Sequence, residues 1–219
     1  MNSELAATFT RIYNDKIWGS AEGAQSPFFS GDGSHNPLVL SHYLSAMLTL
    51  LRFFQLYAGR KPNVVDLGCG DFFVGAQLRE HCAQYTACDI VAPLVEYNRT
   101  AYAHLNVDFR VVDITRDELP AGDIVTIRQV LQHLSNEDIA SVLPSLRSQF
   151  QLLVLTEHVP IGAFVPNLNK PSDEHNRLNL NSGVVLTSPP FNLPIADEFV
   201  IATAPEAGGI VHTVAYRIA

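Results

Sequence analysis

The chain has 219 residues, enough for one large hydrophobic core and too few for two. Hydrophobic residues make up 47% of it and charged residues 16%, a balance that excludes disorder and favours strands covered on both faces. The net charge of −8 argues against sequence-independent nucleic-acid binding and against attraction to anionic membranes.

The first 59 residues predict a helical extension with a glycine-rich loop in its middle. A weak helical pattern covers residues 5–15, and a stronger apolar one covers 37–58. Asn36 suits the N-cap of the second helix and Gly59 its C-terminal end. The polar residues that precede and interrupt the apolar run predict a buried or half-buried helix rather than a membrane span.

The N-terminus and the cysteines predict a protein of the reducing cytoplasm. A basic segment followed by an apolar one is missing at the start, so we expect no signal peptide. The odd number of cysteines (Cys69, Cys82 and Cys88), without a CxxC pair, argues against a disulfide framework and a zinc site.

From residue 60 onward, short apolar runs alternate with amphipathic stretches. The runs predict strands at 63–67, 85–90, 107–112, 123–127 and 152–156, and the stretches predict helices at 73–82, 92–105 and 136–149. This alternation is typical of an α/β fold with a mainly parallel sheet and helices on both faces. Residues 60–219 are therefore expected to form one domain, to which residues 1–59 belong as an extension.

The alternation stops after Thr156. Residues 159–195 are rich in Pro, Asn, Ser and Gly, and a loop of this length in a compact domain is usually functional or disordered. Two further strands are predicted at 198–202 and 210–216. Residues 203–209 are too few for a crossover helix, so these strands should pair as an antiparallel hairpin.

The first strand of the alternating region leads into a glycine turn that opens the next helix. Gly68 and Gly70 permit positive φ angles and allow a ligand to approach bare backbone. Cys69 lies between them and Asp71 follows. In such sheets, ligands lie at the carboxyl ends of the strands, where the strand order reverses.

Aspartates end three successive predicted strands, and this is a more specific signal than the glycines. Asp66 ends the first and Asp89 the second, 23 residues later, a separation that suits hydrogen bonds to ribose hydroxyls. Asp113 ends the third, where a carboxylate can accept a hydrogen bond from the exocyclic amine of adenine.

The loop disfavours a dinucleotide. The GxGxxG pattern requires a third glycine where this chain has Phe73, and Asp71 would repel a phosphate. S-adenosylmethionine fits better, because it joins adenosine to a cationic sulfonium and an amino group without a phosphate. Asp66 or Asp71 could face that ammonium.

These residues, with the segment 123–134, resemble the class I S-adenosylmethionine-dependent methyltransferases over residues 60–157. The resemblance implies a Rossmann-like seven-stranded, mainly parallel sheet that ends in an antiparallel hairpin. It also implies that the glycine loop and Arg128-Gln129 surround the methionine part of the cofactor. Asp89 with Ile90 would then bind ribose and Asp113 with Ile114 adenine. Phe72 departs from the family, because many members have a third glycine there.

Methyl transfer chiefly requires a positioned acceptor, and a base helps when the acceptor carries a proton. Three candidates for that base lie near the expected site. His133 follows the fourth strand, and Glu157 and His158 follow the fifth. Each has a structural alternative, either packing or a solvated strand end.

Candidate acceptor-binding residues lie in the long loop. His175 and Arg177 belong to a polar cluster, Asp173–Arg177, in which an arginine could bind a carboxylate. The segment Ser188–Phe191 resembles a Pro-Pro-aromatic motif of amine and nucleobase methyltransferases, but it lies after the wrong strand. We therefore expect a rigid turn there, with Phe191 beside the acceptor. Metal binding is not expected, because no ligand spacing accompanies the acidic cluster.

Trp18 and the aromatic residues near it predict a lid over the cofactor, made by residues 12–36 together with 159–192. The sequence thus favours a methyltransferase with a small-molecule acceptor. The alternative is a non-catalytic protein that binds S-adenosylmethionine or S-adenosylhomocysteine on the same scaffold. A nicotinamide dehydrogenase is disfavoured by Phe73, and a nucleic-acid methyltransferase by the charge.

Overall fold

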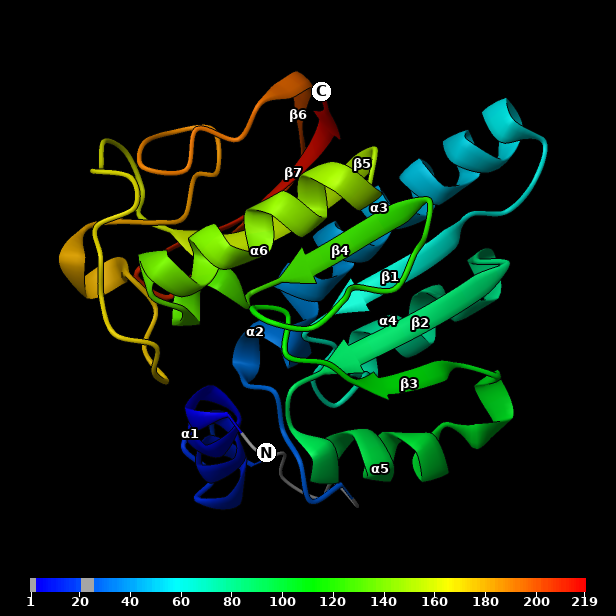
Figure 1. The fold of residues 1–219 in the computed structure, drawn as a ribbon, viewed down its shortest axis with the longest axis horizontal. Helices are drawn as coiled ribbons and strands as arrows, with labels where there is room; N and C mark the ends of the chain where they lie inside the picture. Colours follow the sequence, from blue (N-terminus) through cyan, green and yellow to red (C-terminus); the bar gives the residue numbers. More distant parts are fainter. Residues whose placement is uncertain (1–2, 21–25) are drawn as a thin grey trace.

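The computed structural model describes residues 3–20 and 26–219, which fold around one seven-stranded sheet (Figure 1). Its strands are β1 (Asn63–Leu67), β2 (Gln84–Asp89), β3 (Asp108–Val111), β4 (Ile124–Arg128), β5 (Leu152–Val159), β6 (Ile195–Glu206) and β7 (Gly209–Ile218). Their order is β3-β2-β1-β4-β5-β7-β6. The first five strands are parallel, and β7 is antiparallel to both β5 and β6, which confirms the predicted fold class.

Helices cover both faces of the sheet. They are α1 (Glu4–Asn14), α2 (Asp32–His35), α3 (Pro37–Ala58), α4 (Phe73–Leu78), α5 (Ala92–Ala101) and α6 (Asn136–Gln149). Short 3-10 turns lie at η1 (Arg79–His81), η2 (Ala103–Leu105), η3 (Leu131–His133) and η4 (Leu178–Leu180). One apolar cluster joins α1 and α6 to the sheet, and a second joins α3, α4 and α5 to its other face.

The strand order reverses between β1 and β4, which are hydrogen-bonded neighbours. The connections from β1 to β3 lead away from β4 on one side, and those after β4 lead away on the other. A crevice therefore opens at the carboxyl ends of β1 and β4. Helices α1 and α2 lie at this edge of the sheet (Figure 1).

Helix α3 is half-buried, as predicted. The side chain of Asn36 accepts a hydrogen bond from the N–H of Leu38 at 3.0 Å, and Gly59 ends the helix with a φ of 70°. A stripe that includes Tyr43 and Met47 packs in the second cluster. By length and composition, α3 is the one helix within residues 3–20 and 26–219 that could cross a membrane.

The antiparallel strands are longer than the apolar runs predicted. Strand β5 continues to Val159, so Glu157 and His158 lie inside it rather than beyond its end, which corrects the sequence expectation. Strands β6 and β7 extend to Glu206 and Gly209, which are paired, so the turn is much shorter than predicted. Cross-strand backbone hydrogen bonds extend strands past the point where their side chains stop being apolar.

The segment between β5 and β6 packs on the sheet. Within it the structure shows η4 and otherwise turns and irregular backbone. Val184, Leu186, Phe191 and Leu193 are buried in the first cluster. The peptide bond between Pro189 and Pro190 is cis. The predicted long loop therefore covers one face of the sheet where a helix is common.

Candidate active site

A cavity of about 340 Å³ lies in the crevice at the carboxyl ends of the strands. This volume falls in the usual range for small-ligand sites, about 300–1,000 Å³. All the predicted cofactor residues line it: Trp18, Asp66, Gly68, Cys69, Gly70, Asp71, Asp89, Ile90, Asp113, Ile114, Arg128 and Gln129. The structure thus gathers these side chains around one space, and their roles toward a cofactor remain predictions.

The glycine turn after β1 has the backbone that only glycine adopts easily. Gly68 has a φ of 80° and Gly70 a φ of 55°. The N–H groups of Gly68 and Cys69 donate to the carbonyl of Cys88 at 2.8 and 2.9 Å, which ties the turn to β2. A Cβ atom at Gly68 would overlap Val130, so the turn also requires the small residue for space.

Phe72 follows Asp71 in the turn and has a φ of 61°, in the left-handed region that favours glycine. Its ring is fully buried away from the cavity, in edge-to-face contact with Tyr85, Tyr102 and Phe109. The turn therefore keeps its left-handed backbone without a glycine, and the phenyl ring does not enter the cavity.

Asp66 lies in the sheet below the turn. Its carboxylate accepts hydrogen bonds from the hydroxyls of Tyr85 and Thr126, each at 3.0 Å. Burial raises the pKa of Asp66 to about 6, although these hydrogen bonds and the nearby Arg128 lower it. A carboxylate this constrained can add one further partner from the cavity side, such as an ammonium or a water molecule.

Asp89 holds the turn from the end of β2. Its two oxygens accept the N–H groups of Gly70 and Val91, both at 3.0 Å. Burial raises the pKa of Asp89, and the backbone hydrogen bonds oppose that shift. Each oxygen has a second lone pair, so the carboxylate can still accept a pair of hydroxyl groups.

Asp113 lies just after β3, and its two oxygens differ: Oδ1 is hydrogen-bonded, whereas Oδ2 has only a long contact of 3.9 Å with the exposed Arg116. Its Oδ1 accepts the N–H and the hydroxyl of Thr115, at 3.1 and 2.6 Å. Its Oδ2 is buried and has no hydrogen-bond partner within the described chain. A buried carboxylate oxygen without a donor is costly, and the amine of an adenine ring would satisfy it.

The segment after the first helix is fastened to the glycine turn by Asp71. This carboxylate accepts the N–H of Ser30 at 3.0 Å and contacts Nε2 of His35 at 2.7 Å. The N–H of Asp71 donates back to the hydroxyl of Ser30 at 2.7 Å. Asp71 lines the cavity, but its oxygens mainly hold the N-terminal segment in place.

Arg128 and Gln129 hold the same segment from the end of β4. The guanidinium of Arg128 donates to the carbonyl of Gly33 at 2.5 Å and to the hydroxyl of Ser34 at 3.1 Å, and it lies over the ring of Tyr43. Gln129 has a φ of 54° and packs so closely on Gly33 that a Cβ there would overlap it. Residues 30–34 therefore form a wall of the cavity.

Trp18 closes the cavity beside His133. Their rings lie 5.0 Å apart, and the indole N–H donates to the carbonyl of Glu174 at 3.2 Å. Burial lowers the pKa of His133 to about 4, and its Nδ1 is buried without a hydrogen-bond partner in the described chain. A neutral imidazole is thus available at this wall.

The other predicted bases differ in their access to the cavity. His158 lines it, and its Nε2 is buried without a partner in the described chain. Glu157 points away and does not line it. The carboxylate of Glu157 accepts the N–H groups of Leu131 and Gln132 at 3.0 and 2.9 Å, and burial raises its pKa to about 8. Glu157 therefore supports turn η3 rather than facing an acceptor.

The three predicted acceptor-binding residues lie outside the cavity. Arg177 is fully buried, and its guanidinium donates to the carbonyls of Leu168, Leu131, Gln132 and Leu134 and to the amide oxygen of Asn136. No donor remains for a substrate carboxylate. His175 is exposed beside Asp173, and Phe191 is buried in the first cluster. These positions correct the sequence interpretation.

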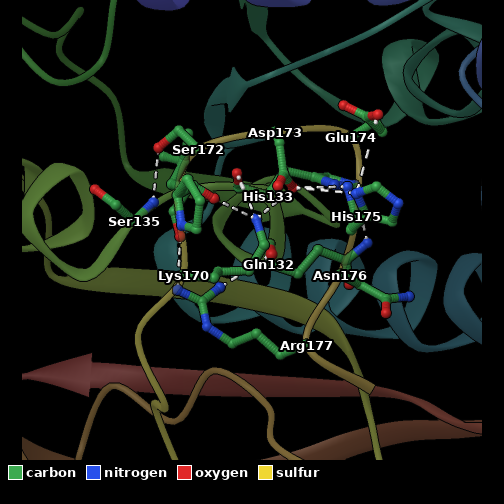
Figure 2. Close-up of polar contacts among 12 residues, drawn as sticks. Gln132, His133, Ser135, Lys170, Ser172, Asp173, Glu174, His175, Asn176 and Arg177 are labelled. Carbon is green, nitrogen blue, oxygen red and sulfur yellow. Dashed lines mark hydrogen bonds and ion pairs between the residues drawn. The ribbon is translucent and has the colours of Figure 1, made fainter. Parts of the chain in front are cut away.

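The long loop instead contributes neighbours of the predicted residues. Figure 2 shows Arg177 directed toward the segment of Gln132 and His133, while Glu174 extends away from it. Glu174, Asn176 and Gln132 line the cavity, as does Glu206 at the end of β6. The sequence marked the loop cluster as a whole, but it did not show which side chains turn inward.

Within residues 3–20 and 26–219, no group of three His, Cys, Asp or Glu side chains is arranged to hold a metal ion. The donor set around the cavity suits an adenosyl group better. It offers a glycine turn at the cavity wall, a carboxylate with room for two hydroxyls and a carboxylate oxygen that lacks a hydrogen-bond donor.

The fold and the cavity together resemble those of a class I methyltransferase domain. Its marks are the order β3-β2-β1-β4-β5-β7-β6 with an antiparallel β7, the glycine turn after β1, and acids after β2 and β3. The family model described as a methyltransferase domain matches residues 64–150, which confirms the resemblance seen in the sequence.

Curated relatives include an uncharacterized methyltransferase of Mycobacterium bovis, 36% identical over 85 residues, which are 38% of this chain and 42% of that protein. A ubiquinone biosynthesis O-methyltransferase of Xanthomonas oryzae is 31% identical over 122 residues, 53% of this chain and 45% of that one. The chain thus spans less than half the length of either relative.

Solved structures share the fold. The N-methyltransferase NodS of Bradyrhizobium japonicum, in complex with S-adenosylhomocysteine, superposes with a TM-score of 0.65 at 11% identity, over 95% of this chain and 98% of that one. Magnesium protoporphyrin IX methyltransferase of Synechocystis, with bound S-adenosylmethionine, gives 0.58 at 14% identity, over 99% and 98%.

Proposed function

We propose that this protein transfers a methyl group from S-adenosylmethionine to a small-molecule acceptor. The observation that carries the proposal is the buried Oδ2 of Asp113, which lacks a donor in a cavity that Asp89 and the glycine turn also line. The methyltransferase family match and the relatives support the same reaction class.

The predicted cofactor-binding residues would face different parts of S-adenosylmethionine. Gly68 and Gly70 would admit the methionine part, and Arg128 would face its carboxylate from the opposite wall. Asp89 would accept the ribose hydroxyls, and Asp113 the adenine amine. When bound, the cofactor supplies an electrophilic methyl group whose leaving group is a neutral thioether.

The chain's own contribution is positioning and proton removal. Residues 30–34 and Trp18 line the cavity and would limit the access of water to the acceptor. The unpartnered Nε2 of His158 would accept a proton from an acceptor that carries one, and His133 offers a second neutral imidazole. Both histidines lie on the side of the cavity formed after β4 and β5.

The acceptor is proposed to be small, because the cavity has a volume of about 340 Å³ and both the N-terminal extension and the 159–195 loop line it, through Trp18 and Glu174 among others. The net charge of −8 supports the exclusion of nucleic acid. Free thiols at Cys69, Cys82 and Cys88 support the proposal of a reducing, cytoplasmic location.

Calorimetry with S-adenosylhomocysteine tests the proposal. We expect a dissociation constant below about 1 mM for the intact protein, and at least a tenfold weakening, roughly, in Asp89→Ala. Asp89→Asn, which keeps one acceptor oxygen, should bind with intermediate strength. Asp108→Ala, an exposed aspartate on the neighbouring strand, is the matched control and should bind normally.

Absence of binding to the intact protein, or equal binding by both Asp89 variants and the intact protein, would contradict the proposal. If the product binds but no compound in a metabolite extract is methylated, the alternative of a non-catalytic adenosyl-binding protein is favoured.

A further inference from the structure

The cavity continues beyond the predicted cofactor residues into a region that we call the acceptor end: Gln132, His133, His158, Glu174, Asn176 and Glu206. Gln132 and His133 lie in η3 after β4, Glu174 and Asn176 in the loop after β5, and His158 and Glu206 near the ends of β5 and β6. The ribose and adenine aspartates follow β2 and β3, on the other side of the point where strand order reverses. The two groups therefore occupy opposite halves of the crevice.

Contacts hold the acceptor end together. The amide oxygen of Gln132 accepts the N–H of His158 at 2.9 Å, and the amide of Gln132 lies 3.2 Å from Nε2 of His133. His133 packs on Trp18, which donates to the carbonyl of Glu174. Figure 2 shows Gln132 and His133 beside the loop that carries Glu174.

The acceptor end is negatively charged. Glu206 accepts hydrogen bonds from Asn36 and from the N–H of Ala207, at 2.9 and 3.1 Å, and both donors are uncharged. The nearest cation to Glu174 is Arg11, 3.7 Å away with a side chain 55% exposed, so the ion pair is weak.

Three buried or half-buried cations, Arg128, Lys170 and Arg177, are engaged away from the acceptor end. Among the residues that line the cavity, Arg128 is the one Lys or Arg, and it is bound to Gly33 and Ser34 at the methionine end. Lys170 is paired with Asp173 at 2.7 Å, and Arg177 has used all its donors. An anionic acceptor would therefore meet two carboxylates and no free cation.

An independent observation places a base in this region. The side chain of His158 is 7% exposed, lines the cavity, and has an Nε2 without a hydrogen-bond partner in the described chain. Burial lowers the pKa of His158, and the adjacent Glu206 opposes the shift. The ring is thus available as a neutral proton acceptor beside a carboxylate.

We propose that the acceptor end binds a small organic amine, attracted as its ammonium form by Glu174 and Glu206 and deprotonated by His158. This inference rests on the proposed methyltransferase function and adds the acceptor class. Trp18 adds an aromatic wall, which favours a cation over a neutral group of the same shape.

The proton and electron pairs balance. The ammonium gives one N–H proton to Nε2 of His158, and the freed lone pair forms the new N–C bond. The sulfonium C–S bond breaks with its electron pair left on sulfur, which gives the neutral thioether. The imidazolium of His158 then returns its proton to solvent, and Glu206 stabilises the imidazolium while it exists.

The test measures binding rather than turnover. Protein saturated with S-adenosylhomocysteine is titrated, by ligand-observed NMR, with sets of fragments that share a scaffold and differ in one group. One such set is 2-phenylethylamine, 2-phenylethanol and phenylacetate. Across the sets we expect the amines to bind at least about tenfold more tightly than their alcohols, and the carboxylates not at all.

Variants test the residues. Glu174→Gln and Glu206→Gln should each weaken amine binding by a factor of about three to ten and leave alcohol binding unchanged. Glu137→Gln, an exposed glutamate on α6 outside the cavity, is the matched control and should not alter either.

The outcomes separate the two proposals. If S-adenosylhomocysteine does not bind, the methyltransferase function itself is contradicted. If it binds but no amine does, or if alcohols or carboxylates bind as well as the amines, the acceptor class alone is overturned. Unchanged amine affinity in both glutamate variants would also overturn it.

Discussion

Phe72 shows how one residue can replace the conformational freedom of glycine by packing. A left-handed backbone costs a non-glycine residue about 1–2 kcal/mol, and full burial of a phenylalanine ring returns about 1.5–3 kcal/mol. The ring of Phe72 also occupies the space that a Cβ at Gly75 would need. Gly75 in α4 therefore leaves room for the ring of Phe72, which precedes that helix. The packing of this ring therefore offsets the cost of the left-handed backbone in the turn.

Asp113 should determine the choice of base in the cofactor. Its unpartnered oxygen can accept a hydrogen bond from the adenine amine, whereas hypoxanthine presents a carbonyl there that would be repelled. We expect the protein to bind S-adenosylhomocysteine at least about tenfold more tightly than S-inosylhomocysteine, and Asp113→Asn to remove most of that preference. Calorimetry with both ligands measures it. An Asp113→Asn variant that keeps the full preference would refute this assignment.

The sequence predicted the cofactor half of the cavity because the aspartates directly follow apolar strands. Parallel pairing then brings the strand ends to one edge. The acceptor half could not be predicted in the same way. Glu174 and Arg177 are three residues apart in one loop, yet one lines the cavity and the other is buried beneath η3. Arg177 is buried because its guanidinium binds backbone carbonyls that come together only in the folded chain. The sequence alone therefore does not show which of the two residues lines the cavity.

At the scale of elements, turn η3 depends on two buried side chains, Glu157 and Arg177. Glu157 accepts two of its backbone N–H groups, and Arg177 binds the carbonyls of Leu131 and Gln132. This pair fixes the backbone that presents Gln132 and His133 to the cavity. Both the backbone N–H groups and the backbone carbonyls of the turn are therefore hydrogen-bonded to these two side chains.

Replacing Arg177 should therefore destabilise the protein strongly. Arg177→Met leaves several buried carbonyls without donors and Glu157 without its positive neighbour, so we expect a loss of about 3–5 kcal/mol in unfolding free energy. Arg177→Lys should lose less, because it keeps the charge. Urea unfolding measures both, with the half-exposed Arg11→Met as control. A loss below about 1 kcal/mol in Arg177→Met would show that the turn does not need this residue.

Element boundaries were predictable where the chain carries its own signals. The bounds of β1, α3 and α6 match the predictions because apolar runs, caps or a flanking glycine mark them. Helix α2 has four residues, too few for a periodic pattern, and was missed. Strand β6 was too short in the prediction because it is an edge strand with many exposed side chains, held by backbone pairing with β7.

At the scale of the whole molecule, buried titratable groups couple stability to pH in opposite directions. Burial raises the pKa of Asp66 to about 6 and lowers that of His133 to about 4. Between these values the folded state holds more protons than the unfolded state at Asp66 and fewer at His133. The free energy of unfolding therefore falls with pH through Asp66 and rises with pH through His133. A substitution at one of the two residues is needed to measure its contribution separately.

Asp66→Asn isolates the contribution of Asp66. The carboxyl has an ordinary pKa of 3.8 when unfolded and about 6 when folded, so the stability it gives is present below pH 4 and lost as pH rises through 6. The free energy of unfolding of the intact protein, relative to Asp66→Asn, should fall by about 2.4 kcal/mol between pH 4 and pH 7. The hydroxyls of Thr126 and Tyr85 can bond to the amide, so the variant should fold.

Urea unfolding at steps of about one pH unit measures both profiles, with the exposed Asp108→Asn as control. Parallel profiles for the intact protein and Asp66→Asn would show that the carboxyl is not perturbed by folding.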